Sequence, residues 1–166
     1  GTRPAQVVAI TAAGWLVIAF AATWGAGRGR SMLGRPTGWL LVVALATAPT
    51  FLLWFLMWTM MWPEASAPVP AFGIHLACFA TTIVFSLSPI VAFVVARHGS
   101  DPVKPRATGA ALGAAAGAWA GVMIDLHCPV SATAHVLVAH VAPIVFLAVA
   151  GAWLGRRVLG IGSPRT

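Results

Sequence analysis

Cysteine and histidine residues gather in two stretches of the chain, and their side chains can bind metals. His75 and Cys78 are three residues apart, so they share one face of a helix. Thiolate and imidazole groups suit zinc, copper and other soft metals. The spacing of His135 and His140, five residues, is looser and does not require a common face. The candidate metal ligands are His75, Cys78, His127, Cys128, His135 and His140.

Other readings of these residues stay open. Cys78 and Cys128 could pair in a disulfide in an oxidising compartment, or each could be a small buried apolar residue. The histidines could serve as hydrogen-bonding groups between helices. Asp125 is either a carboxylate that orients a ligating histidine or an interface residue bonded to His127 or to the following segment. Met60 and Met61 are either thioether ligands for Cu(I) or packing residues.

The composition indicates a membrane protein. The chain has 166 residues, of which 60% are hydrophobic and 8% charged, and its mean hydropathy is +0.91. Soluble domains carry about 25% charged residues. This composition excludes a soluble enzyme and a disordered tail. A nucleic-acid-binding domain is also excluded, because ten Lys and Arg residues are too few for a basic groove.

The hydrophobic residues fall into five stretches, each long enough to cross the roughly 30 Å hydrocarbon core as a helix. The predicted fold is an all-α membrane protein, with residues 1–166 forming a single bundle because every linker is short. The first stretch is interpreted as a membrane span in preference to a signal peptide. The predicted spans are residues 5–25, 38–62, 72–96, 107–126 and 135–154.

Two spans contain a proline that could kink the helix and leave a carbonyl without its donor. In a membrane, neighbouring Ser or Thr side chains can satisfy such a carbonyl. Thr47 is close to Pro49, and Ser86 and Ser88 are close to Pro89. We expect these hydroxyl groups to bond the freed carbonyls.

The charges predict the orientation of the bundle. Nine of the ten basic residues fall on one side, and the other side has only Arg3 together with Glu64. The positive-inside rule then places the C-terminus in the cytoplasm and the N-terminus outside. The candidate ligands lie in the outer third of the bundle, and His98 lies on the cytoplasmic side. The nine basic residues are Arg28, Arg30, Arg35, Arg97, Lys104, Arg106, Arg156, Arg157 and Arg165.

Two further patterns indicate helix packing and docking. Glycines recur every four residues along the fourth span, which lets another helix approach backbone to backbone. A tryptophan stripe on the second span indicates a face toward lipid, a partner protein or a lipophilic molecule. The glycines are Gly109, Gly113, Gly117 and Gly121, and the tryptophans are Trp54, Trp58 and Trp62. The sequence has no enzyme motif that would suggest catalysis. It also has no internal repeat and no row of polar residues along the spans that would suggest transport.

The later part of the chain resembles the NrsF family of multi-pass membrane anti-sigma factors. The resemblance covers about residues 72–160 and includes Cys78, the Ser86, Ser88 and Pro89 group, and Arg97. Its most specific part is Leu126-His127-Cys128-Pro129, followed by a span with His135 and Gly151 that ends in Gly155-Arg156-Arg157.

The resemblance implies a protein that holds an ECF-type sigma factor at the bacterial inner membrane and inhibits transcription. It implies that Cys78 and Cys128 carry a response to heavy metal or oxidative stress; the ligand types by themselves leave copper and zinc as candidate ions. It also implies six spans, so the family's first span and N-terminal segment are expected to be missing here. The alternative is an accessory subunit of a respiratory or photosynthetic complex, in which the outer histidines contact a pigment or haem.

Overall fold

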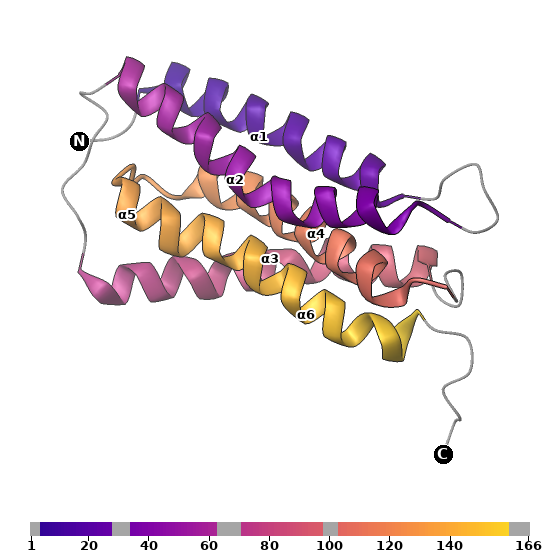
Figure 1. The fold of residues 1–166 in the computed structure, drawn as a ribbon. Helices are drawn as coiled ribbons and strands as arrows, with labels where there is room; N and C mark the ends of the chain where they lie inside the picture. The colour runs from indigo at the N-terminus through magenta and orange to yellow at the C-terminus, as the bar shows by residue number, and fades with distance from the viewer. Residues whose placement is uncertain (1–3, 28–33, 63–70, 98–102, 160–166) are drawn as a thin grey trace.

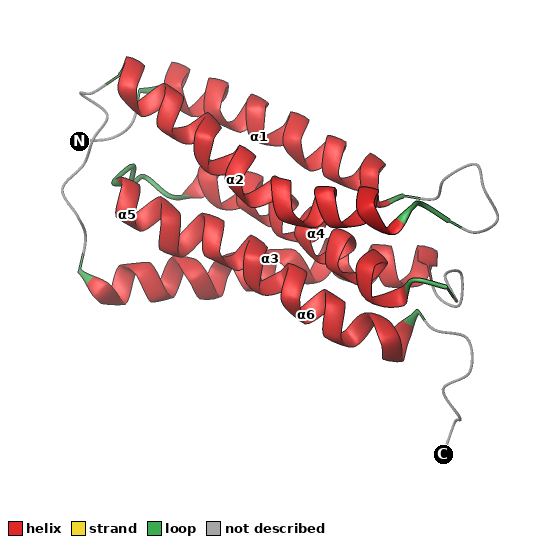
Figure 2. Ribbon diagram, in the orientation of Figure 1, coloured by secondary structure: helices red, strands yellow, loops and turns green. Residues whose placement is uncertain are grey.

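The computed structural model describes residues 4–27, 34–62, 71–97 and 103–159. Within these ranges the structure is helical and has no strands (Figures 1 and 2). The elements are α1 (Ala5–Ala26), α2 (Thr37–Met61), α3 (Phe72–Arg97), α4 (Pro105–His127), α5 (Thr133–Val136), the π-helical turn η2 (Leu137–Val141) and α6 (Ala142–Val158).

The five predicted spans are confirmed. Five helices are long and apolar enough to cross a membrane, with α5, η2 and α6 forming one continuous span, Thr133–Val158. The largest difference is at the last span, which runs to Val158 instead of residue 154. The helix continues because Arg156 and Arg157 suit its C-terminal end, where the helix dipole favours cations, and Arg157 also lies over the ring of Trp153.

Helix α4 is the centre of the bundle. It contacts α1, α2, α3 and α6, and 16 of its 23 residues are buried. Its mean hydropathy of 1.4 is the lowest of the five spans, which otherwise lie between 2.0 and 2.2. Glycine and alanine, only weakly apolar, are tolerated here because protein and not lipid surrounds the helix.

The glycines of α4 meet the backbone of α6. A Cβ at Gly109 would overlap the carbonyl of Gly151, and one at Gly113 would overlap the carbonyl of Leu147. Gly117 lies against Cα of Ile144. Gly121 instead accommodates the ring of Phe51 from α2. The ridge therefore contacts two different helices, α6 along most of its length and α2 at its end.

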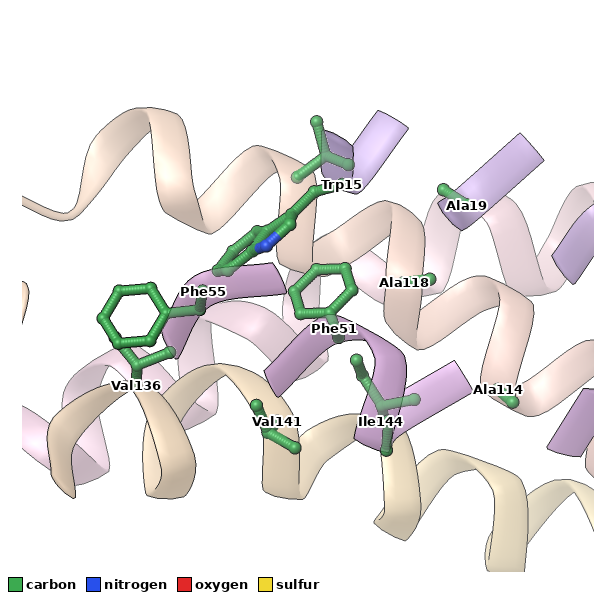
Figure 3. Packing of buried hydrophobic residues seen from close by; sticks show 11 residues of the cluster. Trp15, Ala19, Phe51, Phe55, Ala114, Ala118, Val136, Val141 and Ile144 are labelled. Carbon is green, nitrogen blue, oxygen red and sulfur yellow. The ribbon is translucent and has the colours of Figure 1, made fainter. Parts of the chain in front are cut away.

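Helices α1 and α2 cover another side of α4 with larger side chains. Trp15 of α1 is fully buried, and its ring centroid lies 3.9 Å from that of Phe51. Figure 3 shows these rings with Phe55 between α1, α4 and the last span. Bulky aromatic residues fill this layer because the small residues of α4 leave room for them.

The tryptophan stripe is continuous, but its deepest member packs inside the bundle. Ring centroids are 5.6 Å apart for Trp54 and Trp58 and 6.0 Å apart for Trp58 and Trp62. Trp54 lies against Gly14 of α1, and its Nε1 donates to the carbonyl of Thr11 at 3.2 Å. The expectation that Trp54 faces lipid or a partner is therefore corrected in part: Trp54 is half-buried, and the missing side chain of Gly14 lets its indole join α1 to α2.

The expected role of the hydroxyl groups of Thr47 and Ser86 is wrong. Both α2 and α3 continue through their prolines. Thr47 donates to the carbonyl of Val43 and Ser86 to that of Ile83, each in its own helix. The carbonyls that Pro49 and Pro89 free are those of residues 45 and 85, four positions earlier. A hydroxyl reaches back three or four residues from its own position, so Thr47 and Ser86 miss these carbonyls. The expectation for Ser88 stays a prediction.

Helix α3 has a polar inner face. Its buried residues are His75, Thr82, Ser86 and Arg97, all of them polar and all separated by whole turns. Many of its apolar residues are exposed, and half-buried Phe93 packs against a hydrophobic cluster of the bundle. Thus α3 contributes polar groups to the bundle, and its inner face carries the candidate site.

The two ends of the bundle differ in their polar groups. At the end where α4 begins, Lys104 donates to the carbonyl of Arg35 at 3.2 Å, and Arg35 donates to that of Trp24 at 3.3 Å. At the opposite end, where α4 finishes and α5 begins, lie the cysteines and histidines. Arg3, Arg28, Arg30, Glu64, His98 and Arg165 fall outside the described residues.

The contact between α4 and α6 can be tested with Gly113→Ala. The new methyl group would overlap backbone atoms of α6, and we expect a loss of about 1–3 kcal/mol from overpacking. The measurement is thermal unfolding in detergent micelles. Gly38→Ala is the matched control, because nothing lies within 4 Å of its added Cβ. Equal stability of the two variants would contradict the importance of the close approach.

Candidate functional site

Three side chains that are far apart in the sequence meet where α3, α4 and α5 come together. The sulfur atoms of Cys78 and Cys128 are 3.7 Å apart. Nε2 of His135 lies 3.2 Å from Sγ of Cys128. The three ligand atoms all lie within 4.8 Å of one another, close enough to bind a single metal ion. Of the six candidate ligands, these three form one compact set.

Helix α3 positions two of the candidate groups. His75 and Cys78 lie in its first two turns; His75 faces His135 of the fifth span and Cys78 faces Cys128 at the end of α4. The ring centroids of His75 and His135 are 4.9 Å apart. His75 is buried and Cys78 is half-buried. His75 therefore lies beside the three-residue set, outside it but in contact.

Cys128 is the residue at which α4 ends. Its backbone N–H donates to the carbonyl of Ile124 at 2.7 Å, and its own backbone is extended. Its side chain is buried, with 6% exposure. The end of the helix thus holds the thiol inside the bundle, and the turn that follows returns the chain to His135.

The π-helical turn brings His135 and His140 to the same side of the fifth span. The N–H of Ala142 donates to the carbonyl of Leu137, five residues earlier. This wider turn places residues five apart above one another. The two rings have centroids 5.4 Å apart, and both side chains are fully buried. A regular helix would have separated them.

Pro143 and Thr82 together account for the local geometry of this turn. Pro143 has no N–H, so it leaves the carbonyl of Ala139 without its usual donor. Thr82 of α3 is fully buried, and its Oγ1 lies 2.9 Å from that carbonyl and 2.8 Å from the carbonyl of Cys78. The single hydroxyl proton is therefore shared between a carbonyl of α3 and a carbonyl of the fifth span, and Thr82 brings the two backbones together.

Asp125 is buried and bonded to the first span. Thr11 Oγ1 donates to its Oδ2 at 2.9 Å, and the residue is 1% exposed. A buried carboxylate is stable only with such partners. A role in orienting a histidine stays a prediction.

Some predicted site residues lie away from the three-residue set. His127 is exposed, and its Nδ1 contacts the carbonyl of Met123 at 2.7 Å, so it neither bonds Asp125 nor joins the set. Position 127 turns outward because it is two residues after the buried Asp125, which places it about 200° around the helix from that residue. Met60 and Met61 are exposed, at 79% and 60%, which removes them as ligands.

Thr82 and Thr11 were not anticipated from the sequence. Thr82 follows Cys78 by four residues, and that spacing places it on the same helix face. A polar residue within a span, on the face that carries a cysteine, is the signal that could have found it. No comparable spacing links Thr11 to Asp125, because the two residues belong to different helices.

The arrangement supports two kinds of chemistry. Paired thiols with a neighbouring imidazole can bind a soft metal. They can also be oxidised to a disulfide after a short movement, because sulfur atoms in a disulfide are about 2.05 Å apart. A disulfide would join α3 covalently to the end of α4, and a bound metal would join the same two elements by coordination.

The comparisons with known proteins identify one family. The family model for NrsF, negative regulator of sigma F, matches residues 3–160. The match is longer than the resemblance over residues 72–160, because it includes the first two spans. None of the curated proteins and none of the solved structures compared matches the chain significantly.

The bond from Thr82 to the fifth span can be tested with Thr82→Val, which keeps the shape and removes the hydroxyl. We expect a loss of about 0.6–1.7 kcal/mol in thermal unfolding, the range of hydrogen bonds between membrane helices. Thr81→Val is the matched control, because Thr81 is exposed and bonds only within its helix, to the carbonyl of Ala77. If both variants unfold alike, the bond does not stabilise the site.

Proposed function

The chain belongs to the family of negative regulators of sigma F, and we propose that it is a membrane-bound anti-sigma factor with a sensor built from Cys78 and Cys128. Its partner would be a sigma factor of the ECF type, held at the bacterial inner membrane. The family match supports the regulatory role. The observation that carries the sensing role is the distance of 3.7 Å between two sulfur atoms that belong to different helices.

The signal would be heavy metal or oxidant at the outer end of the bundle. Oxidation removes two electrons and two protons from the thiols, and a peroxide accepts them as it is reduced to water. A metal ion would instead displace the two thiol protons and bind both sulfur atoms. Oxidation would draw α3 and the end of α4 together, and a metal ion would fix them to each other, because the two cysteines belong to these two elements.

The response would reach the other end of the bundle through rigid helices. Helix α4 contacts all the other long helices, so a shift of its outer end alters the contacts of α4 with each of them. Its glycines present backbone to α6, a surface on which one helix can slide past another. At the far end lie Arg35, Lys104, Arg156 and Arg157, whose cytoplasmic placement would let them contact the sigma factor.

The orientation of the bundle can be tested with reporters at the C-terminus. Basic residues favour the cytoplasmic side. We therefore expect a green fluorescent protein fused after Thr166 to be fluorescent and alkaline phosphatase at the same position to be inactive. An active phosphatase would place the basic end outside and reverse the proposed direction of signalling.

The function can be tested by gentle purification from native membranes, with mass spectrometry of the associated proteins. We expect a sigma factor in the eluate, and its loss after cells receive cadmium or peroxide. Replacement of both cysteines, Cys78→Ser with Cys128→Ser, should keep the sigma factor bound but abolish its release. His127→Gln, an exposed histidine near Cys128, is the control and should respond normally.

Two results would contradict the proposal. Release of the sigma factor from the double cysteine variant would mean that the cysteines are not the sensor. Recovery of a large energy-transducing complex without a sigma factor would favour an accessory subunit instead.

A further inference from the structure

We propose that Cys78, Cys128 and His135 form a metal site for zinc or cadmium, in which His75 supplies the fourth ligand. This inference rests on the proposed function in one respect, because metal binding would be the signal for release. It goes further in adding two histidines to the cysteine pair and in fixing the class of ion, a divalent cation that prefers sulfur and nitrogen ligands in tetrahedral geometry.

The distances match those that a bound ion would impose. Zinc binds sulfur at about 2.3 Å and imidazole nitrogen at about 2.0–2.1 Å, at tetrahedral angles, which places two sulfur ligands about 3.8 Å apart and sulfur about 3.6 Å from nitrogen. The corresponding distances here are 3.7 Å between the two sulfur atoms and 3.2 Å from Cys128 Sγ to His135 Nε2. For these two pairs only shifts of a few tenths of an ångström are needed. The third pair, Cys78 Sγ and His135 Nε2, lies within 4.8 Å and would close further around an ion.

The imidazole of His135 is held in place before any ion binds. It is fully buried, and it lies at the start of the span just before the π-helical turn. Thr82 connects that turn to the backbone of Cys78. A ligand whose rotamer is already restricted loses little entropy on binding, and this increases the affinity.

His75 is the best placed candidate for the fourth position. It is one helical turn before Cys78, and its ring lies 4.9 Å from that of His135. Its Nδ1 is buried and, among the residues that the structure describes, has no hydrogen-bond partner. Rotation of the His75 side chain would bring a ring nitrogen to the fourth ligand position. Binding of the ion would then give the buried nitrogen a partner.

The charge of the completed site suits its surroundings. Two thiolates and two neutral imidazoles around a divalent cation have a net charge of zero. A net charge inside an apolar bundle would be costly. The four ligands also come from α3, from the end of α4 and from the fifth span, so an ion would join three elements, whereas a disulfide would join two.

The site can be tested by titration of the purified full chain with Cd²⁺ under reducing conditions. The thiolate-to-metal charge-transfer band in the ultraviolet measures Cd²⁺ binding. Loss of this band on addition of Zn²⁺ measures the binding of Zn²⁺ at the same site. We expect one ion per chain and release of about two protons per ion, since both thiols must be deprotonated. Loss of the ligand in His135→Gln should weaken Cd²⁺ binding by at least about tenfold, on the order of the effects seen for groups that support metal ligands.

Three variants separate a ligand from a structural residue. His135→Cys should restore tight binding, because a thiolate replaces the imidazole. His75→Gln should also weaken binding, and His127→Gln should not, because His127 is exposed and lies outside the site. Thermal unfolding of each variant, with a count of reactive thiols, shows whether the fold is retained.

Two results would overturn the proposed ligand set. One is a folded His135→Gln variant that binds Cd²⁺ as tightly as the unchanged protein. The other is an unchanged protein that binds no ion while both thiols are reduced. An unchanged affinity in His75→Gln overturns its place as fourth ligand. Co-purification of the sigma factor is scored on the same samples. If the sigma factor co-purifies but no metal binds, only the metal site is contradicted. If metal binds but no sigma factor co-purifies, only the proposed anti-sigma function is contradicted.

Discussion

The close approach of α4 to its neighbours is the contact on which the rest of the structure depends. Because Gly109 and Gly113 have no side chains, the backbone of α6 lies directly against α4. Lipid tails are as apolar as the side chains, so membrane helices associate mainly through such packing and not through a hydrophobic driving force. Once α4 is central, α1 and α2 cover it with aromatic residues and α3 is placed at the edge.

The apolar surroundings of a membrane helix bundle govern its polar groups. Each buried hydroxyl, carboxyl or carbonyl needs a partner from the protein. Asp125 is bonded by Thr11 from α1, and the carbonyl freed by Pro143 is bonded by Thr82 from α3. These two bonds connect helices that are distant in the sequence. The second one also determines where His135 stands relative to Cys78, so a requirement of the membrane fold shapes the candidate site.

The candidate site and the basic residues lie at opposite ends of the bundle. In the proposed function, a signal at the cysteines would therefore have to cross most of the length of the helices. Helix α4 extends from one end to the other, beginning beside Lys104 and ending at Cys128. A helix is stiff along its axis, and α4 contacts all the other long helices, so a displacement at Cys128 has a direct physical route to Lys104.

Hydropathy alone determined the five spans, because a membrane-crossing helix needs about 20 apolar residues whatever its neighbours are. The glycine repeat likewise predicted a packing face. The tertiary structure decided which helices meet that face, that Trp54 packs on Gly14, and that His127 points away from its neighbour Cys128. It also decided that His135 and His140 share a side, since a π-helical turn depends on Pro143 and on a donor from another helix. Such contacts join residues that no local spacing relates, and for this reason only the folded chain specifies them.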